Sequence, residues 1–462
     1  MRNVAAIILA AGGSTRFGRP KQLLDWGGVP LVAHIADQAL AAGLTPVVVV
    51  LGNQAEAIRA VLGNRPVQTA MNWRWESGLS TSVHAGLTAL PPETEAAIFL
   101  QCDQPLVNAN LLRALVSRFE ESHAPIVYPT HAGQRRPPVL FARCFFPELA
   151  AVTGDEGGRA VIARHPNEVA SVEVADPDAL ADIDTPEDYE RLAPRARTHK
   201  TLQAIRHVIV DMDGVLWRGD TPAPGLHEFF AFLRERGIGF ILATNNSSRL
   251  PEQYAEKLAR FGVEVSPDHI LTSSQVAAAY LATVALPGTR VYAIGEEGVQ
   301  RALTERGFML TDEEAAYVVV GWDRQLTWSK LATAALLIYE GAAFVGTNPD
   351  PNYPIERGPV PGNGAQLAAL QTATGVTPLV VGKPEPLMYE EAMRRMGARR
   401  ETTAVIGDRL DTDIAGGVRL GLTTVLVLSG IATQADLDAS PVKPDLVCAD
   451  IQEFVTLART AP

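Results

Sequence analysis

Short apolar runs alternate with amphipathic stretches along almost the whole chain. In the first part, the pattern predicts buried strands at Val4–Leu9, Val47–Leu51, Ala97–Leu100 and Pro125–Tyr128. Helical patterns lie between them, as at Leu31–Ala42, Gln54–Val61 and Asn110–Glu121. Strands separated by helices predict a parallel sheet covered on both faces. Ligands of such sheets bind at the carboxyl ends of the strands, so the residues after each strand are the first candidates for function.

The alternation is interrupted at 195–205, where the chain is polar and basic and has no periodicity. We predict that this segment links a domain at 1–194 to a domain at 206–462. The pattern then restarts with strands at His207–Val210, Phe240–Ala243, Val291–Ile294, Tyr317–Val320, Ala343–Val345, Leu379–Val381, Thr403–Ile406 and Thr424–Leu428. The predicted fold class is α/β, with two Rossmann-like three-layer domains in tandem.

Composition narrows the class of protein. The chain has 462 residues, of which 47% are hydrophobic and 20% charged, which excludes a wholly disordered chain. The formal net charge of -12 repels phosphate backbones and argues against nucleic acid as a partner. No apolar stretch is long enough to span a membrane. Three scattered cysteines fit a reducing cytoplasm, so we expect a cytoplasmic location.

The first candidate site follows the first strand. Small residues let the backbone approach a ligand closely, and free amides there can hold phosphate oxygens. The segment is Leu9, Ala10, Ala11, Gly12 and Gly13, followed by the cations Arg16 and Lys21. Asp103 ends a later strand, and Asp184 stands in the segment Asp182–Tyr189; both can hold Mg²⁺. The alternatives are a tight turn with surface cations, and two aspartates that only cap helices.

Taken together, these pieces resemble the nucleotidyltransferases of the molybdenum cofactor group, most closely its cytidylyltransferases. The resemblance covers about residues 3–192 and rests on Leu9–Leu24, Asn72–Ser82, Cys102–Val107, Gly154–Arg159 and Asp182–Tyr189. It implies that Gly12–Lys21 binds the nucleoside triphosphate. It also implies that Gly78, Ser80 and Ser82 lie near the base, and that Asp103 and Asp184 hold Mg²⁺. The implied reaction is in-line attack of a substrate phosphate on the α-phosphate, with release of pyrophosphate.

One segment departs from the group's pattern. Arg136-Pro137-Pro138 stands where the group has Gly-His-Pro, close to the expected position of the acceptor. Molybdopterin as the acceptor, and CTP rather than GTP as the donor, therefore rest on resemblance alone. A sugar phosphate or polyol phosphate is the alternative acceptor.

The second candidate site begins where an apolar strand ends in Asp211 and Asp213. In an extended chain this spacing puts both carboxylates on one side, where two close anions favour a bound cation such as Mg²⁺. Asp211 can then act as a nucleophile and Asp213 as a general acid and base. Other strand ends carry Thr244, Asn245 and Asn246, then Lys383, and then Asp408. Each has a plainer interpretation, as a turn, an amphipathic lysine or a helix cap.

The order of these motifs resembles the haloacid dehalogenase superfamily, in the branch that contains 4-nitrophenylphosphatase, phosphoglycolate phosphatase and the nucleotide phosphatase of the N-acetylglucosamine operon. The resemblance covers about residues 206–455. It implies that Asp211 is nucleophile and metal ligand, and that Asp213 is acid/base and lends its carbonyl to Mg²⁺. Thr244, Asn245, Asn246 and Lys383 would hold the phosphate, Asp408 would be the third metal ligand, and Asp413 would support them.

The same branch carries a mobile α/β cap between the second and third motifs, which we place at about 280–380. Members of this branch often dimerise through the cap. The sequence leaves the oligomeric state open, with a homodimer through the cap as one candidate. The main hypothesis is a bifunctional Mg²⁺-dependent enzyme that joins nucleotidyl transfer to phosphomonoester hydrolysis. The alternative from another class is that one domain only senses nucleotide for the other.

Overall fold

The computed structural model describes residues 3–14, 17–355 and 357–460. The chain divides into two compact units, of which the first runs to Gln203 and the second from Ala204 to Ala458. Among the described residues, no helix has both the length and the hydrophobicity that crossing a bilayer requires. The two units are described in turn.

Within the described residues, the first unit is built on an eight-stranded sheet in which β1 (Val4–Leu9) is central. β1 pairs in parallel with β4 (Val47–Leu51) and β6 (Ala96–Gln101). The strand order is β10-β7-β9-β6-β1-β4-β5, with β8 beside β7. The remaining strands are β5 (Gln68–Met71), β7 (Ile126–His131), β8 (Gln134–Arg135), β9 (Val139–Ala142) and β10 (Val169–Glu173).

The expectation of a purely parallel sheet was wrong for β9, which runs antiparallel to both β6 and β7. The reason is the short connection. Only Ala132 and Gly133 separate β7 from β8, and β8 and β9 then pair antiparallel with β7 one after the other, whereas a parallel crossover needs a dozen residues or more. The sheet is therefore mixed, with β9 running antiparallel between β7 and β6.

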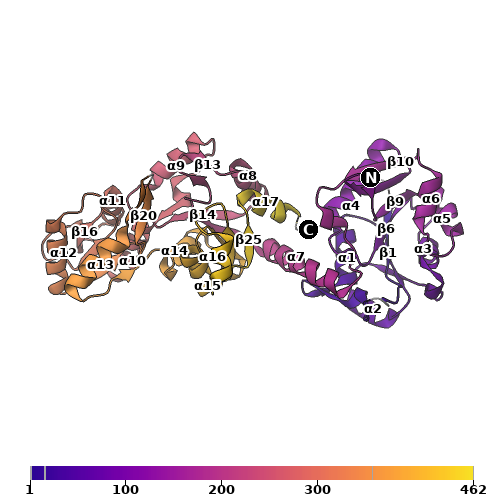
Figure 1. Cartoon of the computed structure of the whole chain (residues 1–462), viewed down its shortest axis with the longest axis horizontal. Coiled ribbons are helices and arrows are strands. Elements are labelled where there is room, and N and C mark those ends of the chain that lie inside the picture. Colours follow the sequence, from indigo (N-terminus) through magenta and orange to yellow (C-terminus); the bar gives the residue numbers. More distant parts are fainter. Residues whose placement is uncertain (1–2, 15–16, 356, 461–462) are drawn as a thin grey trace. The chain divides into compact units, whose positions relative to one another are not determined.

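Helices cover both faces of this sheet, as predicted. Figure 1 shows α1 (Leu31–Ala41), α2 (Ala55–Leu62) and α4 (Ala109–Ser122) on one side, and α3 (Leu79–Thr88), α5 (Phe146–Ala151) and α6 (Gly158–Arg164) on the other. Side chains of a strand alternate between faces. Ile8 accordingly packs in one buried cluster with Ile35 of α1, and Ile7 in the other with Val161 of α6.

Helix α7 (Pro186–Ala204) includes the segment in which the sequence shows no periodicity. Asp188 starts the helix by accepting the backbone N–H groups of Asp184 and Thr185 at 3.1 and 2.9 Å. Leu192 and Ala196 then pack into a buried cluster of the first unit. Residues 195–204 are therefore helical, because packing of a few side chains stabilises the helix without a full apolar stripe.

Within the described residues, the second unit contains a six-stranded parallel sheet in the order β15-β14-β11-β23-β24-β25. These strands are β11 (His207–Val210), β14 (Gly239–Thr244), β15 (Ile270–Thr272), β23 (Thr403–Gly407), β24 (Thr423–Val427) and β25 (Leu446–Cys448). The helices around it are α8 (Leu226–Arg236), α9 (Pro251–Arg260), α10 (Ser273–Val284), α14 (Pro386–Met396), α15 (Ala415–Leu420), α16 (Gln434–Ala439) and α17 (Ile451–Thr460).

A second sheet is inserted along the chain between β15 and β23. Its order is β17-β16-β18-β19-β22, and all its pairings are parallel. Its strands are β16 (Arg290–Ile294), β17 (Met309–Leu310), β18 (Tyr317–Val320), β19 (Ala343–Gly346) and β22 (Leu379–Val380), and its helices are α11 (Glu297–Glu305), α12 (Trp328–Tyr339) and α13 (Asn363–Thr374). We call residues 290–380 the inserted segment.

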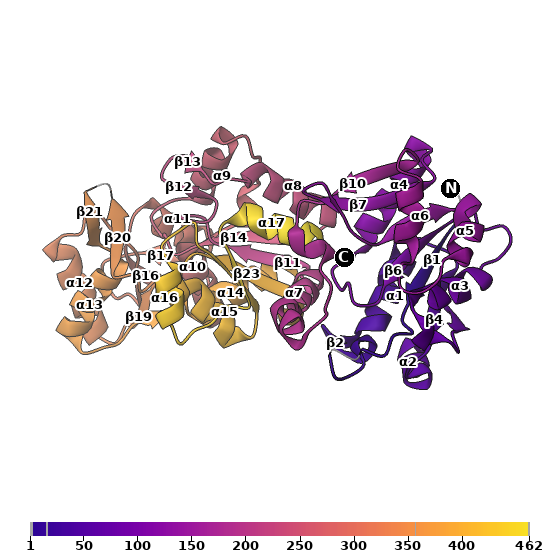
Figure 2. The same ribbon diagram turned by 45° about the vertical axis from the view of Figure 1, so that its right-hand side comes forward.

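The inserted segment also carries a hairpin of β20 (Asn352–Ile355) and β21 (Gly358–Pro361). Figure 2 shows this hairpin above α12 and α13. The predicted fold class, tandem α/β domains with an inserted α/β layer in the second, is confirmed.

Candidate functional sites

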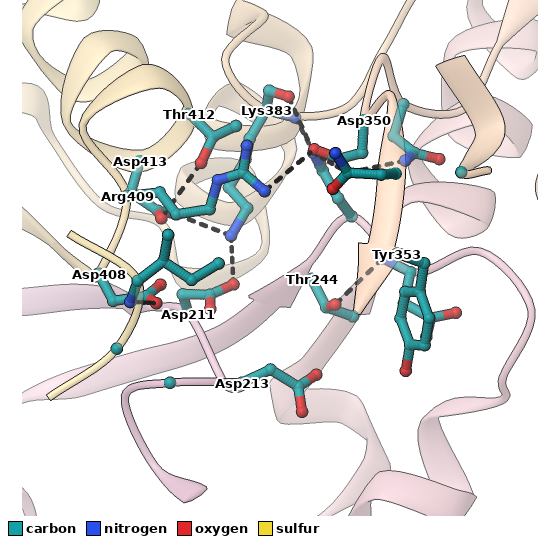
Figure 3. A pocket seen from close by; sticks show the side chains of 18 of the residues that line it. Asp211, Asp213, Thr244, Asp350, Tyr353, Lys383, Asp408, Arg409, Thr412 and Asp413 are labelled. Atoms are coloured by element: carbon teal, nitrogen blue, oxygen red, sulfur yellow. Dashed lines mark hydrogen bonds and ion pairs between the residues drawn. The ribbon is translucent and has the colours of Figure 1, made fainter. Parts of the chain in front are cut away.

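The second unit gathers its candidate residues at the carboxyl ends of its strands. Asp211 follows β11, Thr244 ends β14, Asp408 follows β23, and Lys383 lies between β22 and α14. All four line one cavity of about 700 Å³. Figure 3 shows the four side chains around a common space, with Lys383 above Asp211. The structure thus brings together residues that are 172 positions apart in sequence.

Lys383 is the cation at the centre of this site. Its Nζ forms an ion pair with Asp211, lies 2.8 Å from Asp413 Oδ1, and donates to the carbonyl of Ala243 at 3.1 Å. Burial alone would lower the pKa of Lys383, but the negative charges of Asp211 and Asp413 outweigh it and raise that pKa. The lysine is therefore a fixed positive charge at the floor of the cavity.

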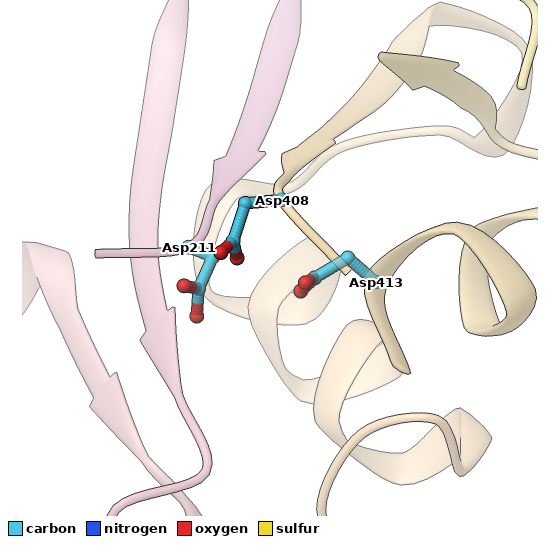
Figure 4. A group of neighbouring side chains, drawn as sticks. All are labelled: Asp211, Asp408 and Asp413. Atoms are coloured by element: carbon cyan, nitrogen blue, oxygen red, sulfur yellow. The ribbon is translucent and has the colours of Figure 1, made fainter. Parts of the chain in front are cut away.

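Three carboxylates face one another beside this lysine. Among the described residues, the oxygens of Asp211, Asp408 and Asp413 form a group within 4.8 Å of one another (Figure 4). Burial raises the pKa of Asp211, and burial together with the charge of Asp413 raises the pKa of Asp408 to about 6. Three such anions exceed the single charge of Lys383. An all-oxygen donor set with excess negative charge fits Mg²⁺, a hard divalent cation.

Backbone groups hold Asp408 in place. Its Oδ2 accepts the N–H of Ile431 at 2.8 Å, and its carbonyl accepts the N–H of Ala432 at 3.0 Å. Gly214 has φ +92°, and a Cβ there would overlap the Asp408 carboxylate. A residue with a side chain at 214 would therefore displace Asp408.

Asp213 lies apart from the three clustered carboxylates, although it lines the same cavity. Its Oδ1 accepts the indole N–H of Trp217 at 2.6 Å. Trp217 is 1% exposed; the ammonium group of Lys257 lies 4.6 Å from its ring, and the ring of Tyr254 stacks at 6.5 Å. One oxygen of Asp213 is thus held by a buried, immobile donor, while the residue still borders the cavity.

The loop after β14 is tied to Lys383. The side-chain oxygen of Asn245 accepts the backbone N–H of Lys383 at 2.7 Å. The side-chain Nδ2 of Asn245 donates to the backbone carbonyl of Lys383 at 2.9 Å and to the Asp350 carboxylate at 3.0 Å. The Thr244 hydroxyl accepts the N–H of Asn246 at 3.1 Å. The loop 244–246 and Lys383 therefore form one rigid wall of the cavity.

In the first unit, Lys21 joins the two predicted acidic residues. Its Nζ lies 2.7 Å from Asp184 Oδ1 and 3.3 Å from Asp103 Oδ2. Burial raises the pKa of Asp103, and the positive charge of Lys21 offsets only part of this effect. For Lys21, burial is outweighed by Asp184 and Asp103, so its pKa is raised. Two carboxylates with a lysine between them can hold a divalent cation and a triphosphate together.

The backbone of the predicted nucleotide loop is held by Gln22. Its Nε2 donates to the carbonyls of Ala10 and Gly12 at 3.0 and 2.8 Å. Ala10 and Ala11 are buried, Gly12 is exposed, and Leu9 and Gly13 are half-buried. A Cβ on Gly13 would lie 3.0 Å from the Trp75 ring. Arg16, the other predicted cation of this loop, lies outside the described residues.

The segment Gly78–Ser82 begins α3 next to a second loop. Gly78 has φ +104°, and the N–H of Ser80 donates to the carbonyl of Gly154 at 3.0 Å. The hydroxyl of Ser82 accepts the Asn72 side-chain N–H at 2.9 Å. Ser80 and Ser82 are both buried, so these contacts order the segment, and their part in binding a base stays a prediction.

One residue near the sites has a larger part than the sequence indicated, and two others were not singled out from sequence. Asp413 lies in the carboxylate group itself, whereas the resemblance implied only that it supports the metal ligands. Its place shortly after Asp408 and Asp411 in the sequence was the available sign of this position. Gln22, adjacent to Lys21, orders the loop. Asp182, two residues before Asp184, has a buried Oδ1 without a hydrogen-bond partner. Burial, together with the charges of Asp103 and Asp184, raises the pKa of Asp182 to about 6.

Comparison with known proteins finds a family model that matches each unit. A model of the MobA-like NTP transferase domain matches residues 6–169. A haloacid dehalogenase-like hydrolase model matches residues 208–309, and a HAD-hydrolase-like model matches 380–454. Both resemblances inferred from the sequence are thereby confirmed at the level of the family.

Individual relatives match the second unit over nearly their full length. An acid sugar phosphatase of Staphylococcus aureus is 38% identical over 255 residues, which are 55% of this chain and 98% of that protein. A 4-nitrophenylphosphatase of Thermotoga maritima has a TM-score of 0.54 at 34% identity, over 55% of this chain and 98% of its own. A glycerol phosphate phosphatase of Mycobacterium tuberculosis, solved in complex with magnesium, has a TM-score of 0.52 at 36% identity. The match covers 55% of this chain and 77% of that one. The chain therefore belongs to the haloacid dehalogenase-like hydrolases through its second unit, and residues 6–169 of its first unit match the model of the MobA-like NTP transferase domain.

Proposed function

We propose that the chain is a bifunctional enzyme, with phosphomonoester hydrolysis in the second unit and nucleotidyl transfer in the first. The convergence of Asp211, Thr244, Lys383 and Asp408 on one cavity carries the phosphatase proposal. The phosphatases and the magnesium complex among the relatives support it.

In the proposed hydrolysis, an oxygen of Asp211 attacks the phosphorus atom, and the bond from phosphorus to the leaving oxygen breaks. Asp213 gives its proton to that oxygen and then takes a proton from the water that hydrolyses the aspartyl phosphate. Lys383 and the loop of Thr244, Asn245 and Asn246 hold the phosphoryl oxygens. Asp211, Asp408 and Asp413, with the Asp213 carbonyl, would hold Mg²⁺, which supplies positive charge opposite the phosphoryl group.

In the proposed transfer, Gly12–Lys21 holds the triphosphate and Gly78, Ser80 and Ser82 border the base. Lys21 offsets charge on the departing pyrophosphate. Asp103 and Asp184 would hold Mg²⁺. CTP as donor and molybdopterin as acceptor are our specific proposal, supported by the resemblance of the loops.

A sugar or polyol phosphate is the second candidate acceptor. Arg136, in the segment that departs from the group's pattern, contributes a positive charge close enough to lower the pKa of Asp182, which burial raises. Arg136 thus lies near Asp182, which neighbours Asp103 and Asp184, and there it can meet an anionic acceptor. Molybdopterin and sugar phosphates both carry such a group, so the acceptor must be decided by experiment.

The deciding experiment measures pyrophosphate release from CTP and from GTP with Mg²⁺, with and without molybdopterin. Release from CTP that depends on molybdopterin supports the cytidylyl proposal. No release with molybdopterin, from protein that still hydrolyses 4-nitrophenyl phosphate, contradicts it; a panel of sugar and polyol phosphates then tests the second acceptor. A phosphatase rate that changes with CTP while CTP is not consumed would instead support a nucleotide-sensing first unit.

We further propose that the inserted segment acts as the cap of the second unit. We also propose that two copies of the chain dimerise through this cap, and that the protein is located in the cytoplasm. Helix α12 supports the dimer, because Trp328, Leu336 and Tyr339 are 83%, 61% and 64% exposed. An apolar patch of this kind is typical of an interface. Light scattering on wild type and on Leu336→Glu tests it: the wild type should be a dimer and the variant a monomer. Cell fractionation tests the location.

A further inference from the structure

The cavity of the second unit has an aromatic wall that the proposed chemistry does not use. Trp322 follows β18 and Tyr353 lies on β20, and both line the cavity together with Asp213 and Thr244. Their ring centroids are 4.4 Å apart, with an interplanar angle of 33°. Figure 3 shows Tyr353 on the far side of Thr244 from Asp408. The aromatic wall thus borders the part of the cavity away from the clustered carboxylates.

Contacts on several sides hold Trp322 in place. Its backbone N–H donates to the Ser247 hydroxyl at 2.9 Å, and its indole N–H donates to the Pro361 carbonyl at 3.1 Å. The guanidinium carbon of Arg324 lies 5.6 Å from its ring centroid, and Arg324 is itself fixed by Glu296 through bonds of 2.7 and 2.6 Å. Tyr353 therefore rests against a ring that cannot easily move.

Tyr353 shares its cavity with the residue that would protonate the leaving group, because Asp211, Asp213, Trp322 and Tyr353 all line that one space. Burial, and after it the negative charge of Asp213, raises the pKa of the Tyr353 hydroxyl. With the phosphoryl group at Asp211 and its leaving oxygen at Asp213, the rest of the leaving group has the wall of Tyr353 and Trp322 to rest on. A tyrosine ring presents its face to planar rings, which stack on it.

We propose that Tyr353, backed by Trp322, stacks on the leaving group and selects phosphomonoesters whose leaving group carries a planar unsaturated ring over saturated ones of equal size. This inference rests on the proposed phosphatase activity. Aryl phosphates and nucleoside monophosphates share this chemistry, and a cavity of about 700 Å³ is large enough for either.

The test compares kcat/KM for phenyl phosphate and cyclohexyl phosphate, which differ in the π face of the ring. For each substrate, the wild-type kcat/KM is divided by that of the variant. The intrinsic reactivities of the two phosphate esters then cancel. Tyr353→Leu should lower the value for phenyl phosphate about five-fold and leave cyclohexyl phosphate within about two-fold. Tyr353→Phe should keep the preference. Tyr280→Leu, on α10 and not among the residues that line the cavity, is the matched control and should change neither value. Uridine 5′-monophosphate then shows whether the selected ring is a nucleobase.

The outcomes separate the inference from the activity on which it rests. Equal losses for both substrates, or no loss for either, in a folded Tyr353→Leu protein would overturn the selection by stacking while leaving the phosphatase intact. Circular dichroism and retained hydrolysis of glycerol 3-phosphate show that the variant is folded. A wild-type protein that hydrolyses no phosphomonoester contradicts the proposed phosphatase itself.

Discussion

The ammonium group of Lys383 lies 2.8 Å from Asp413 Oδ1, and the two side chains are only 4% and 2% exposed. The same ammonium group also pairs with Asp211. One buried cation thus holds together two carboxylates from different parts of the chain. Removing one partner of a buried ion pair is costly, because the charge that remains is neither solvated nor paired.

Lys383→Met should therefore abolish phosphatase activity and also destabilise the second unit. We expect its free energy of unfolding, measured with urea in metal-free buffer, to fall by about 3–5 kcal/mol. Lys443→Met is the control: this exposed lysine donates to the backbone carbonyls of Leu437 and Asp438 and, among the described residues, pairs with no buried carboxylate, so the change should be about 1 kcal/mol or less. A Lys383→Met protein as stable as wild type would show that the pair contributes nothing to folding.

Gly214→Ala should impair the carboxylate group through Asp408. Both Gly214 and Gly237 have positive φ, at +92° and +61°, so alanine costs about 1–2 kcal/mol of backbone strain at either position. Only at 214 would the new Cβ overlap the Asp408 carboxylate; at 237 the space is open. Gly214→Ala should thus raise the Mg²⁺ concentration for half-maximal phosphatase activity, and Gly237→Ala should not. Equal Mg²⁺ dependence in the two variants contradicts this.

Trp217→Phe should impair the step in which Asp213 acts. It removes the indole N–H that holds Asp213 Oδ1 but keeps an aromatic ring in the buried site. An alkyl leaving group needs the proton more than 4-nitrophenolate does. We expect kcat/KM, which reports the step that expels the leaving group, to fall about ten-fold more for glycerol 3-phosphate than for 4-nitrophenyl phosphate. A uniform fall for both substrates would mean that Trp217 contributes only to packing.

The two proposed activities should be separable by single substitutions. Asp103→Ala should lower nucleotidyl transfer at least about a hundred-fold, because it removes a carboxylate from the proposed Mg²⁺ site, and should spare phosphatase activity. Asp211→Asn should do the reverse, because it removes the nucleophile. Pyrophosphate release and 4-nitrophenyl phosphate hydrolysis are measured on each variant. Loss of both activities in either folded variant would contradict independent sites.

Much of the fold and of both sites was predictable from sequence. β1, β4, β11 and β18 have the predicted bounds, because each is a short apolar run buried within its sheet. Asp211, Thr244 and Asp408 stand at the carboxyl ends of parallel strands, which meet at one sheet edge whatever the details of packing. Lys21, Asp103 and Asp184 likewise come together in the first unit.

Other features were decided by tertiary contacts that leave no periodic signal. β9 is antiparallel because the chain turns back after β7, and residues 195–204 are helical because α7 packs its side chains into the first unit. The position of Asp213 on Trp217, and of Asp413 in the carboxylate group, depends on side-chain packing within the folded unit. The sequence by itself determined which chemical groups stand at the strand ends, since that follows from hydrophobic pattern and residue type. Only the tertiary structure decided which of those groups pair, because pairing depends on distances between side chains far apart in the chain.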